Sequence, residues 1–392
     1  MGKQNFKIDL PKGLQLKIYL GLALALLFFF FIYFLIFLVG EQTKLLINGY
    51  FLVFIFLLPL LYVSTTESES NEIAVTEKDH PRLFNLIREV SEELNIKMPK
   101  KVLLLPSTQI AVKGFFSKTL IIGIATLGSL SQDEFKAILA HEFGHFYGKD
   151  TIIGGILWNV NRSLEATAGF GKQWFNVMPL AELALIGLIV ALFFKLYSFL
   201  FGLITALYSR QVEYRADFIA STVAGPNNFS MGLTAYSAFS EYFNVVSYSQ
   251  VLKLSEQQKA FVNVYEAISD AYMREDQDKI VRHVIEDERK HFFQTHPSLK
   301  QRLKAVSGLP SKNTKKDEPA INLLNDYEKL EQEMTQVLTK LIHKSHQQAV
   351  INALLEDAKK RQGRCRYCRT QFKTLGELLQ HEAKCEKRQT PS

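Results

Sequence analysis

His141-Glu142-Phe143-Gly144-His145 has the pattern H-E-x-x-H and lies in a stretch that we expect to be helical. Ser131 is a good N-cap, and Glu134 three residues later completes a capping box. Residues 132–147 contain no proline, and their apolar positions recur at helical spacing. The sequence therefore predicts a helix over 132–147 with one apolar face, formed by Phe135, Ile138, Leu139, Phe143 and Phe146.

Two imidazoles on this helix point to a metal site. Positions i and i+4 share one helix face, so His141 and His145 can bind the same metal ion. Zinc is the natural choice, because it takes nitrogen ligands tetrahedrally and leaves one position for water. Glu142 can then act as general base toward that water. The five-residue pattern also arises by chance, and a catalytic zinc needs a third protein ligand from elsewhere in the chain.

Composition limits the class of protein. The 392 residues are enough for two or three domains. The formal net charge of +7 suits a negatively charged partner, either lipid headgroups or nucleic acid. The chain has 3 Cys, all beyond residue 364, which argues against a disulfide framework and for a thiolate metal site in a reducing compartment.

Two apolar runs near the N-terminus, 18–39 and 45–63, are each long enough to cross a hydrocarbon core of about 30 Å. No small-residue cleavage site follows the first run, so we do not expect a cleaved signal peptide. Four lysines within residues 1–17 favour a cytoplasmic N-terminus, and two crossings return the chain to the cytoplasm near residue 64. The alternative is a buried hairpin of a protein core.

A small sheet should precede the H-E-x-x-H helix. Residues 64–80 are polar and acidic and predict a linker, and 81–94 predict an amphipathic helix. Short apolar runs at 101–105, 110–116 and 119–125 predict strands. In zinc proteases an edge strand of such a sheet can hold an extended peptide by main-chain hydrogen bonds.

Candidates for the third ligand follow an apolar run, in the stretch Y-S-R-Q-V-E-Y-R-A-D at 208–217. Glu213 and Asp217 are again at i and i+4. A carboxylate can complete a two-histidine zinc site, so Glu213 is the predicted third ligand. Asp217 lies on the same face and can accept the second ring N–H of a zinc-bound histidine. A solvated charged face is the alternative interpretation.

Three boxes of sequence carry a wider resemblance: A-H-E-F-G-H at 140–145, S-R-Q-V-E-Y-R-A-D at 209–217 and T-H-P-S-L-K-Q-R at 295–302. With the two N-terminal runs, they make residues 15–305 similar to the membrane gluzincin family that contains the HtpX-type proteases and the CAAX prenyl endopeptidases. The resemblance implies a zinc endopeptidase. It also implies three ligands for the catalytic zinc: His141, His145 and Glu213.

The resemblance implies three catalytic residues as well. Glu142 would activate the water, His296 would stabilise the oxyanion, and Arg302 would brace the site. Ile110-Ala111-Val112 stands where many relatives carry Asn-Ala-Phe on the substrate-binding strand, so substrate preference does not transfer.

The stretch between the boxes 140–145 and 209–217 must leave both boxes on the same side of the membrane. Residues 183–207 are strongly apolar, although Lys195 lies at their centre, and 151–175 are weakly apolar. Glu213 must meet His141 and His145, so the number of crossings between them is even. This favours a membrane hairpin over about 151–207, with polar positions facing protein or water. Residues 226–306 have helical patterning, with a long charged helix expected near 255–292.

The C-terminal third has a different character. Residues 308–320 predict a linker from their Gly, Pro, Ser and Lys content. Residues 321–361 predict one long helix with a heptad seam. Pairing with a second copy, packing on the protease and binding of another protein all remain open. The seam consists of Leu323, Tyr327, Leu330, Met334, Val337 and Leu341.

The tail predicts a second metal site, with the spacing Cys365-x₂-Cys368-x₁₂-His381-x₃-Cys385. Phe372 and Leu378 occupy the positions of the small core of a ββα zinc finger. Three thiolates and one imidazole close the coordination shell, so this zinc should be structural. The finger resembles the C2HC variant of DNA-binding fingers.

The finger is strongly basic on its N-terminal side, so nucleic acid, an anionic membrane surface and an acidic protein are all candidate partners. Its basic residues are Lys359, Lys360, Arg361, Arg364, Arg366, Arg369 and Lys373.

Together these patterns predict a mainly α protein: multi-span transmembrane helices, a cytoplasmic zincin-type α+β protease domain with a small sheet, a long helix and a ββα zinc finger. We expect a multi-pass membrane zinc endopeptidase whose active site and finger face the cytoplasm, with substrates among membrane proteins. A CAAX-type prenyl endopeptidase is the alternative within enzymes, and a membrane-anchored regulatory protein is the alternative outside them. The expected divisions are 1–64, 65–307, 308–320, 321–361 and 362–392.

Overall fold

The computed structural model describes most of the chain from residue 71 onward. The described ranges are 71–114, 118–147, 181–256, 263–287, 297–310, 318–361, 363–372 and 374–385, with single positions at 16, 19, 20, 23, 157, 160, 165 and 169. The predicted spans 18–39 and 45–63 and the first arm of the predicted hairpin lie outside these ranges apart from those positions. Among the helices that are described, none is at once long enough and apolar enough to cross a membrane.

The chain divides into two compact units. The first comprises residues 1–244 and 265–328, and the second comprises 245–264 and 329–392. The long helix α8 (Pro226–Glu256) contributes to both units. The first unit contains the H-E-x-x-H helix, and the second contains the cysteine-rich tail.

The first unit is built on a four-stranded mixed sheet. Its strands are β1 (Ile73–Val75), β2 (Lys101–Leu105), β3 (Ile110–Lys113) and β4 (Thr119–Gly123), in the order β1-β2-β4-β3. β2 and β4 run parallel, while β1 and β3 pair antiparallel at the two edges. The three predicted strands are confirmed. β1 was not predicted, because it lies inside the acidic stretch interpreted as a linker.

The central strand β4 ends earlier than the apolar pattern suggests. Ile124 and Ala125 were predicted as strand but begin helix α4 (Ile124–Ser129). Gly123 marks the turn, since a Cβ at this position would lie 2.2 Å from the carbonyl oxygen of Ser107. The neighbouring loop therefore approaches the backbone too closely for any side chain, and the chain leaves the sheet there.

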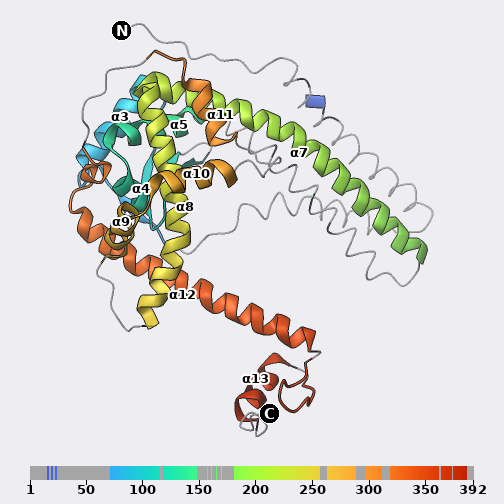
Figure 1. Ribbon diagram of the computed structural model, residues 1–392. Coiled ribbons are helices and arrows are strands. Elements are labelled where there is room, and N and C mark those ends of the chain that lie inside the picture. The colour runs from blue at the N-terminus through green and yellow to red at the C-terminus, as the bar shows by residue number, and fades with distance from the viewer. Residues whose placement is uncertain are drawn as a thin grey trace. The chain divides into compact units, whose positions relative to one another are not determined.

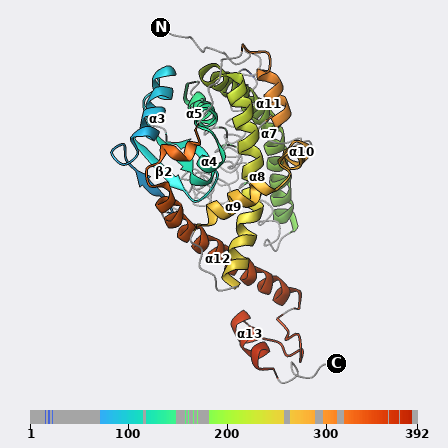
Figure 2. The same cartoon turned by 60° about the vertical axis from the view of Figure 1, so that its left-hand side comes forward.

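Helices α3 (Pro81–Glu93) and α5 (Gln132–Tyr147) gather with α4 around this sheet (Figure 2). The apolar face of α3 is buried at Leu83, Ile87 and Val90. Lys136 of α5 forms ion pairs with two acidic residues of α3, at 2.7 Å to Glu89 and 3.2 Å to Glu93. Both helices match their predicted ranges within a residue.

Helix α7 (Ala181–Ala224) runs through the first unit as a single long helix, and its C-terminal end lies beside α5 and α11 (Leu299–Val306) (Figure 1). The apolar run and the second metal-binding box are therefore one continuous helix. α11 begins at Ser298, whose hydroxyl accepts a hydrogen bond from the backbone of Gln301, and the Gln301 side chain completes the capping box.

The long charged helix predicted near 255–292 is wrong. Within the described residues this region forms two helices, α9 (Val264–Arg274) and α10 (Gln277–Asp287). Asp276 separates them, because its carboxylate accepts a hydrogen bond from the backbone of Lys279 at 3.0 Å. An aspartate that caps the next helix outweighs the helical periodicity on both sides of it.

The predicted linker 308–320 is also wrong at its C-terminal end. The backbone of Ala320 donates to Leu130 at 2.8 Å, and Glu318 accepts a hydrogen bond from Gln132 at 2.8 Å. A 3₁₀ turn, η2 (Ala320–Leu323), follows and packs against α4 and α5. Buried apolar residues in this turn fasten the segment to the first unit, which the Pro and Lys content of the stretch did not reveal.

Helix α12 (Tyr327–Lys360) starts later than predicted, and its buried stripe differs from the heptad seam. Near its start Asn263 donates a hydrogen bond to Glu331 at 2.6 Å, and the backbone of Val264 donates to the hydroxyl of Thr335 at 3.1 Å. This half of the helix thus packs within its own unit, whereas self-association stays a prediction. The buried residues of the stripe are Glu331, Met334, Thr335, Leu338 and Ile342.

Candidate active site

Helix α5 presents the two histidines as the sequence predicts. Its N-terminus is closed by the expected capping box: the backbone of Ser131 donates to the Glu134 carboxylate at 2.8 Å, and the Ser131 hydroxyl accepts from the Glu134 backbone at 3.4 Å. His141 is buried and His145 is half-buried. Their ring centroids lie 4.9 Å apart with the planes nearly perpendicular.

Helix α7 brings Glu213 to these histidines. Its carboxylate oxygens lie 3.5 Å from Nε2 of His141 and 3.7 Å from Nε2 of His145. One ligand atom from each of the three residues lies within 4.8 Å of the others. The close approach depends on Gly144, where an added Cβ would stand 3.2 Å from the Cα of Ala216. A missing side chain on α5 therefore allows the carboxylate of α7 to reach the imidazoles.

Asp217 lies one turn farther along α7 and is fully buried. Its carboxylate is 3.0 Å from Nδ1 of His141. That contact occupies one ring nitrogen and leaves Nε2 to face Glu213, as expected for a metal-binding histidine and its outer carboxylate partner. Burial raises the pKa of Asp217, but hydrogen bonds to His141 and Arg302 and their positive charge lower it on balance.

Arg302 arrives from α11 and engages Asp217 with two nitrogens. Nη2 donates at 2.6 Å and Nε donates at 2.9 Å, in the bidentate arrangement that guanidinium groups form with carboxylates. The same Nη2 lies 3.6 Å from the Glu213 carboxylate. The guanidinium group thus contacts two carboxylates, those of Asp217 and Glu213, which in turn contact the histidines. Arg302 therefore acts by positioning these carboxylates.

The buried charges set the protonation of the two imidazoles. Burial and the charge of Arg302 lower the pKa of His141, but hydrogen bonds to Asp217 and Glu213 outweigh them and raise it to about 9. Burial, helped by the charge of His141, lowers the pKa of His145 to about 3. The surrounding carboxylates thus oppose burial at His141, whereas burial prevails at His145.

Helix α8 contributes two residues that the sequence did not single out. The ring of Phe229 stacks on His141 with a centroid distance of 6.1 Å. The hydroxyl group of Tyr236 has a raised pKa, mainly through burial and also through the negative charge of Glu142. No local pattern marks either residue, because both reach the site only through the packing of α8.

Glu142 is half-buried and lies on α5 directly after His141. Burial lowers the pKa of Arg302, but Asp217 and then Glu213 and Glu142 raise it on balance. The site thus combines three candidate metal ligands with two further carboxylates, those of Glu142 and Asp217. The candidate ligands are His141, His145 and Glu213. Two histidines and one glutamate are one of the donor sets that catalytic zinc sites use in proteins.

Comparison with known proteins agrees with this arrangement. Residues 77–309, more than half of the chain, match peptidase family M48. The chain belongs to peptidase family M48. It is accordingly a zinc metalloendopeptidase of the HtpX and CAAX protease group. The matched range includes both metal-binding boxes and ends just after α11.

Similar proteins include two that are named as HtpX proteases, one from an archaeon and one from a bacterium. The chain is 24% identical over 234 residues to a protein named Protease HtpX homolog from Archaeoglobus fulgidus, covering 58% of this chain and 68% of that protein. It is 25% identical over 242 residues to Protease HtpX from Acinetobacter baylyi, covering 58% and 71%. The family assignment favours the protease over the regulatory-anchor alternative.

Among solved structures, the crystal structure of S. mikatae Ste24p resembles this M48 chain at a TM-score of 0.36 and 16% identity. The alignment covers 76% of this chain and 66% of that one.

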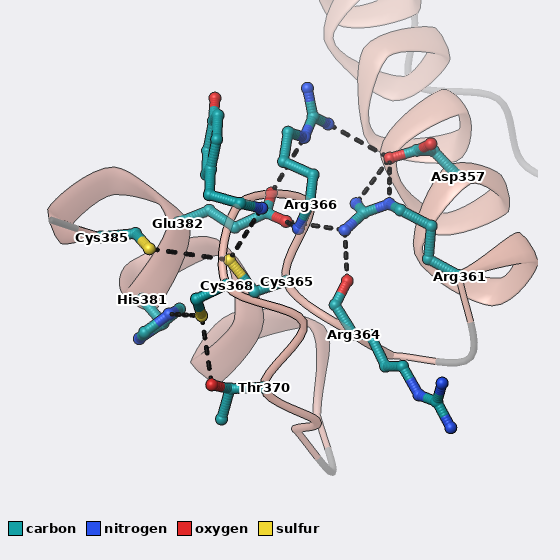
Figure 3. A network of polar contacts seen from close by, with 11 residues as sticks. Asp357, Arg361, Arg364, Cys365, Arg366, Cys368, Thr370, His381, Glu382 and Cys385 are labelled. Atoms are coloured by element: carbon teal, nitrogen blue, oxygen red, sulfur yellow. Dashed lines mark hydrogen bonds and ion pairs between the residues drawn. The ribbon is translucent and has the colours of Figure 1, made fainter. Parts of the chain in front are cut away.

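One predicted residue of the M48 site, His296, lies outside the described residues, so its role in oxyanion stabilisation stays a prediction. The second predicted cluster is assembled in the other unit. Ligand atoms of its four residues all lie within 4.8 Å of one another (Figure 3). The cluster consists of Cys365, Cys368, His381 and Cys385.

Proposed function

We propose that this chain is an integral membrane endopeptidase that cleaves membrane or membrane-associated proteins, with one zinc ion held by His141, His145 and Glu213. The observation that carries the proposal is the convergence of these three ligand atoms next to Glu142. The M48 assignment supplies the reaction class. The residue roles below are inferred from geometry and chemistry.

The donor set fits zinc. Bonds of about 2.0–2.1 Å in a tetrahedral shell place neighbouring ligand atoms roughly 3.3 Å apart. Nε2 of His141 stands 3.5 Å from one carboxylate oxygen of Glu213, and Nε2 of His145 stands 3.7 Å from the other, so both imidazoles face the same carboxylate. Three protein ligands leave a fourth position for water or substrate, as in catalytic sites of the two-histidine and one-glutamate type.

Each side chain of the site has its own proposed role. When bound, zinc polarises the scissile carbonyl and lowers the pKa of water. Glu142 takes the proton of the attacking water and passes it to the leaving amine. Asp217 holds Nδ1 of His141 and thereby directs Nε2 toward the metal position, while Arg302 fixes Asp217. His296 is proposed to stabilise the oxyanion, on the strength of the sequence box alone.

A membrane location is supported by side chains that α7 leaves exposed. Large apolar residues recur on this helix at helical spacing and are each about half exposed: Leu192, Leu196, Phe199, Leu200 and Leu207. An exposed apolar stripe of this length suits contact with lipid. Together with the apolar runs 18–39 and 45–63, it supports a multi-pass protein whose active site faces the cytoplasm, as the N-terminal lysines favour.

The Glu142→Gln variant tests the catalytic assignment. Gln keeps the size of the side chain but cannot accept the proton of the water. We expect the purified variant to retain zinc and to lose peptide cleavage by about 100-fold or more. Zinc content and hydrolysis of a fluorogenic peptide are the two measurements. Proteins that accumulate in membranes of cells carrying the variant would identify the substrates.

An exposed carboxylate on α3 offers a matched control. Glu92→Gln makes the same chemical change far from the histidines and should leave both zinc and activity unchanged. If Glu142→Gln still cleaved peptide at the wild-type rate, the proposed role of Glu142 would be wrong. Accumulation confined to soluble proteins would contradict the proposed substrate class.

A further inference from the structure

The C-terminal tail brings four metal-ligating side chains together without any disulfide among the described cysteines. Sγ of Cys365 lies 3.9 Å from Sγ of Cys385, and Sγ of Cys368 lies 3.0 Å from Nε2 of His381 (Figure 3). Two ligands come from a tight turn, and two come from helix α13 (Leu375–Lys384) and its C-cap. The helix of the predicted ββα finger is present, whereas its two strands are reduced to the single bridge between Arg364 and Gln371, so the finger as a whole stays a prediction.

The turn that carries Cys365 and Cys368 has the geometry of a metal-binding knuckle. The backbone of Cys365 donates to Thr370 at 2.8 Å, and the backbone of Arg369 returns a bond to Cys365 at 3.0 Å. Arg369 has a φ of +65°, which reverses the chain direction. The amide of Tyr367 points at Sγ of Cys365 at 3.4 Å, a contact that stabilises a thiolate.

Apolar packing alone is too small to hold this fold. The buried core of the finger consists of Cys365, Leu378 and Cys385, with Phe372 among the residues packed on it. Phe372 lies against His381, with ring centroids 4.7 Å apart. Domains below about 40 residues usually need disulfides or a metal to fold, and these cysteines form no disulfide. A cation that binds all four side chains would supply the missing stabilisation.

One carboxylate connects this cluster to α12. Glu382 is buried and follows His381 directly. Its Oε1 accepts a hydrogen bond from Nη1 of Arg361 at 2.7 Å and another from the backbone of Arg366 at 2.7 Å. Asp357, one turn before the end of α12, binds the same two arginines at 2.6 and 3.1 Å (Figure 3).

We infer that Cys365, Cys368, His381 and Cys385 bind one structural Zn²⁺, and that this ion locks the finger to the end of α12 through Glu382. Three thiolates and one imidazole form a closed tetrahedral shell, which marks the ion as structural. Because His381 is a ligand, the ion fixes the turn of α13 from which Glu382 reaches Arg361 and the knuckle backbone. Metal binding and the ion-pair network are thus coupled.

The network of Asp357, Arg361, Arg366 and Glu382 also affects which basic residues of the finger can bind a partner. Arg361 and Arg366 belong to the basic face that suggested nucleic acid, yet both direct their guanidinium groups to Asp357 and Glu382. Their charge is balanced within the unit. The structure therefore places these two of the seven basic residues in the junction between finger and helix.

Cobalt substitution of the full-length protein tests the metal site. All 3 Cys of the chain lie in the finger, so absorption from thiolate-to-cobalt charge transfer reports this site alone. We expect a strong near-ultraviolet band that weakens by about a third or more in Cys385→Ser, because one of the three thiolates is removed. Without zinc, the three thiols should react with iodoacetamide roughly tenfold faster than with zinc. Absence of the band, or equal thiol reactivity with and without zinc, would overturn the inference.

The protease site is independent of this readout. Glu213→Gln removes a ligand from the proposed catalytic zinc but none from the finger, so it should lower the zinc content while keeping the thiolate band. A Glu213→Gln chain that kept its full zinc content would count against the catalytic assignment and not against the finger. A wild-type chain that lacked the band but cleaved peptide would count against the finger alone.

Hydrogen exchange of the holoprotein tests the junction. The amide of Arg366 is bonded to Glu382, so Glu382→Gln should speed exchange across 361–368 by roughly fivefold or more while zinc stays bound. Glu377→Gln, an exposed change on the same helix, is the matched control and should have no effect. Chelation should speed exchange in all three chains. Unchanged exchange after chelation, or after Glu382→Gln, would refute the coupling.

Discussion

At the scale of single residues, Asp217 joins the metal-binding helix to the last helix of the M48 range. It contacts Nδ1 of His141 at 3.0 Å and accepts two hydrogen bonds from Arg302, with no exposed surface of its own. A carboxylate in this position both orients an imidazole and neutralises a buried guanidinium group. Removing its charge should therefore lower both the affinity of the site for zinc and the stability of the fold.

The Asp217→Asn variant tests both effects. The amide retains the shape of the carboxylate but leaves Arg302 with less compensating charge in a buried site. We expect zinc affinity to fall about 10- to 100-fold and the free energy of unfolding to fall by about 3 kcal/mol. Competition with a zinc chelator and chemical denaturation measure the two effects.

An exposed aspartate on α9 provides the comparison. Asp270→Asn alters the same functional group outside the site and should change neither zinc affinity nor stability. Wild-type zinc affinity in Asp217→Asn would show that Asp217 does not orient His141.

His80 is a second residue whose environment has a measurable consequence. It is buried before α3, and its Nδ1 accepts a hydrogen bond from the backbone of Asn325 at 3.1 Å, which fastens the segment after η2. Burial lowers the pKa of His80, although Asp79 and Asp326 oppose the shift. The folded state thus prefers the neutral ring, and its stabilisation is complete above the unfolded pKa of about 6.5 and is lost as pH falls below it.

His80→Gln should remove this part of the pH dependence. We expect the thermal midpoint of the wild type to drop more between about pH 7.5 and pH 5 than that of His80→Gln. His283→Gln, at an exposed histidine on α10, should behave like the wild type. Equal drops in the wild type and His80→Gln would contradict the proposed role of the buried ring.

At the scale of secondary-structure elements, the site depends on how closely α5 and α7 pack. Gly144 faces Ala216 and Ile219, with only 3.2 Å between the position of an added Cβ and the Cα of Ala216. Because backbone and not a flexible side chain lies opposite, a methyl group has to push the helices apart. The distances between Glu213 and the histidines would then increase.

Gly144→Ala tests this dependence. Alanine favours a helix over glycine by about 1 kcal/mol, yet we expect lower zinc affinity and at least several-fold lower peptide cleavage. Gly128→Ala on α4 is the matched control, since nothing lies within 4 Å of its added Cβ, and it should preserve activity. Full zinc affinity and activity in Gly144→Ala would show that helix separation does not limit the site.

The elements also show how far local pattern predicts this fold. The helix 132–147 and the three strands follow from periodicity and capping, which act between near neighbours. The break at Asp276 and the fastening of η2 depend on individual hydrogen bonds, which periodicity does not encode. The buried stripe of α12 includes Glu331 and Thr335, two polar residues that a search for apolar heptads passes over.

At the scale of the whole molecule, the meeting of Glu213 with His141 and His145 sets the parity of any membrane crossings between them. Both helices lie at one site, so residues 146–212 must cross an even number of times or not at all. The proposed hairpin over about 151–207 satisfies this requirement with two crossings. Its tip would then lie across the membrane from the active site.

A reporter fused near residue 178 tests this topology. The N-terminal lysines favour a cytoplasmic start, and the runs 18–39 and 45–63 return the chain to the cytoplasm. The first arm of the proposed hairpin then makes a third crossing, so we expect the reporter on the opposite side of the membrane from the N-terminus. A second reporter near residue 225, directly after α7, is the internal control and should be cytoplasmic. A cytoplasmic reporter at 178 would rule out full crossings by the hairpin.

The sequence by itself pointed to the reaction class and to the side chains that could share a metal. The i and i+4 spacing on α5 and α7 and the cysteine spacing of the tail specify which side chains can share a metal, because ligand geometry is local to a helix or a turn. These spacings also carried the resemblance to the family that the comparison later established.

Only the tertiary structure decided how the parts meet. It paired β2 with β4 in parallel and joined β1 to the sheet. It also brought Phe229 of α8 to His141, and Tyr236 of α8 within the electrostatic influence of Glu142. It also turned Arg361 and Arg366 from a basic face into a junction with Glu382. Such contacts join residues far apart in the chain and depend on how the elements pack. The spacing of residues within one element does not predict this packing.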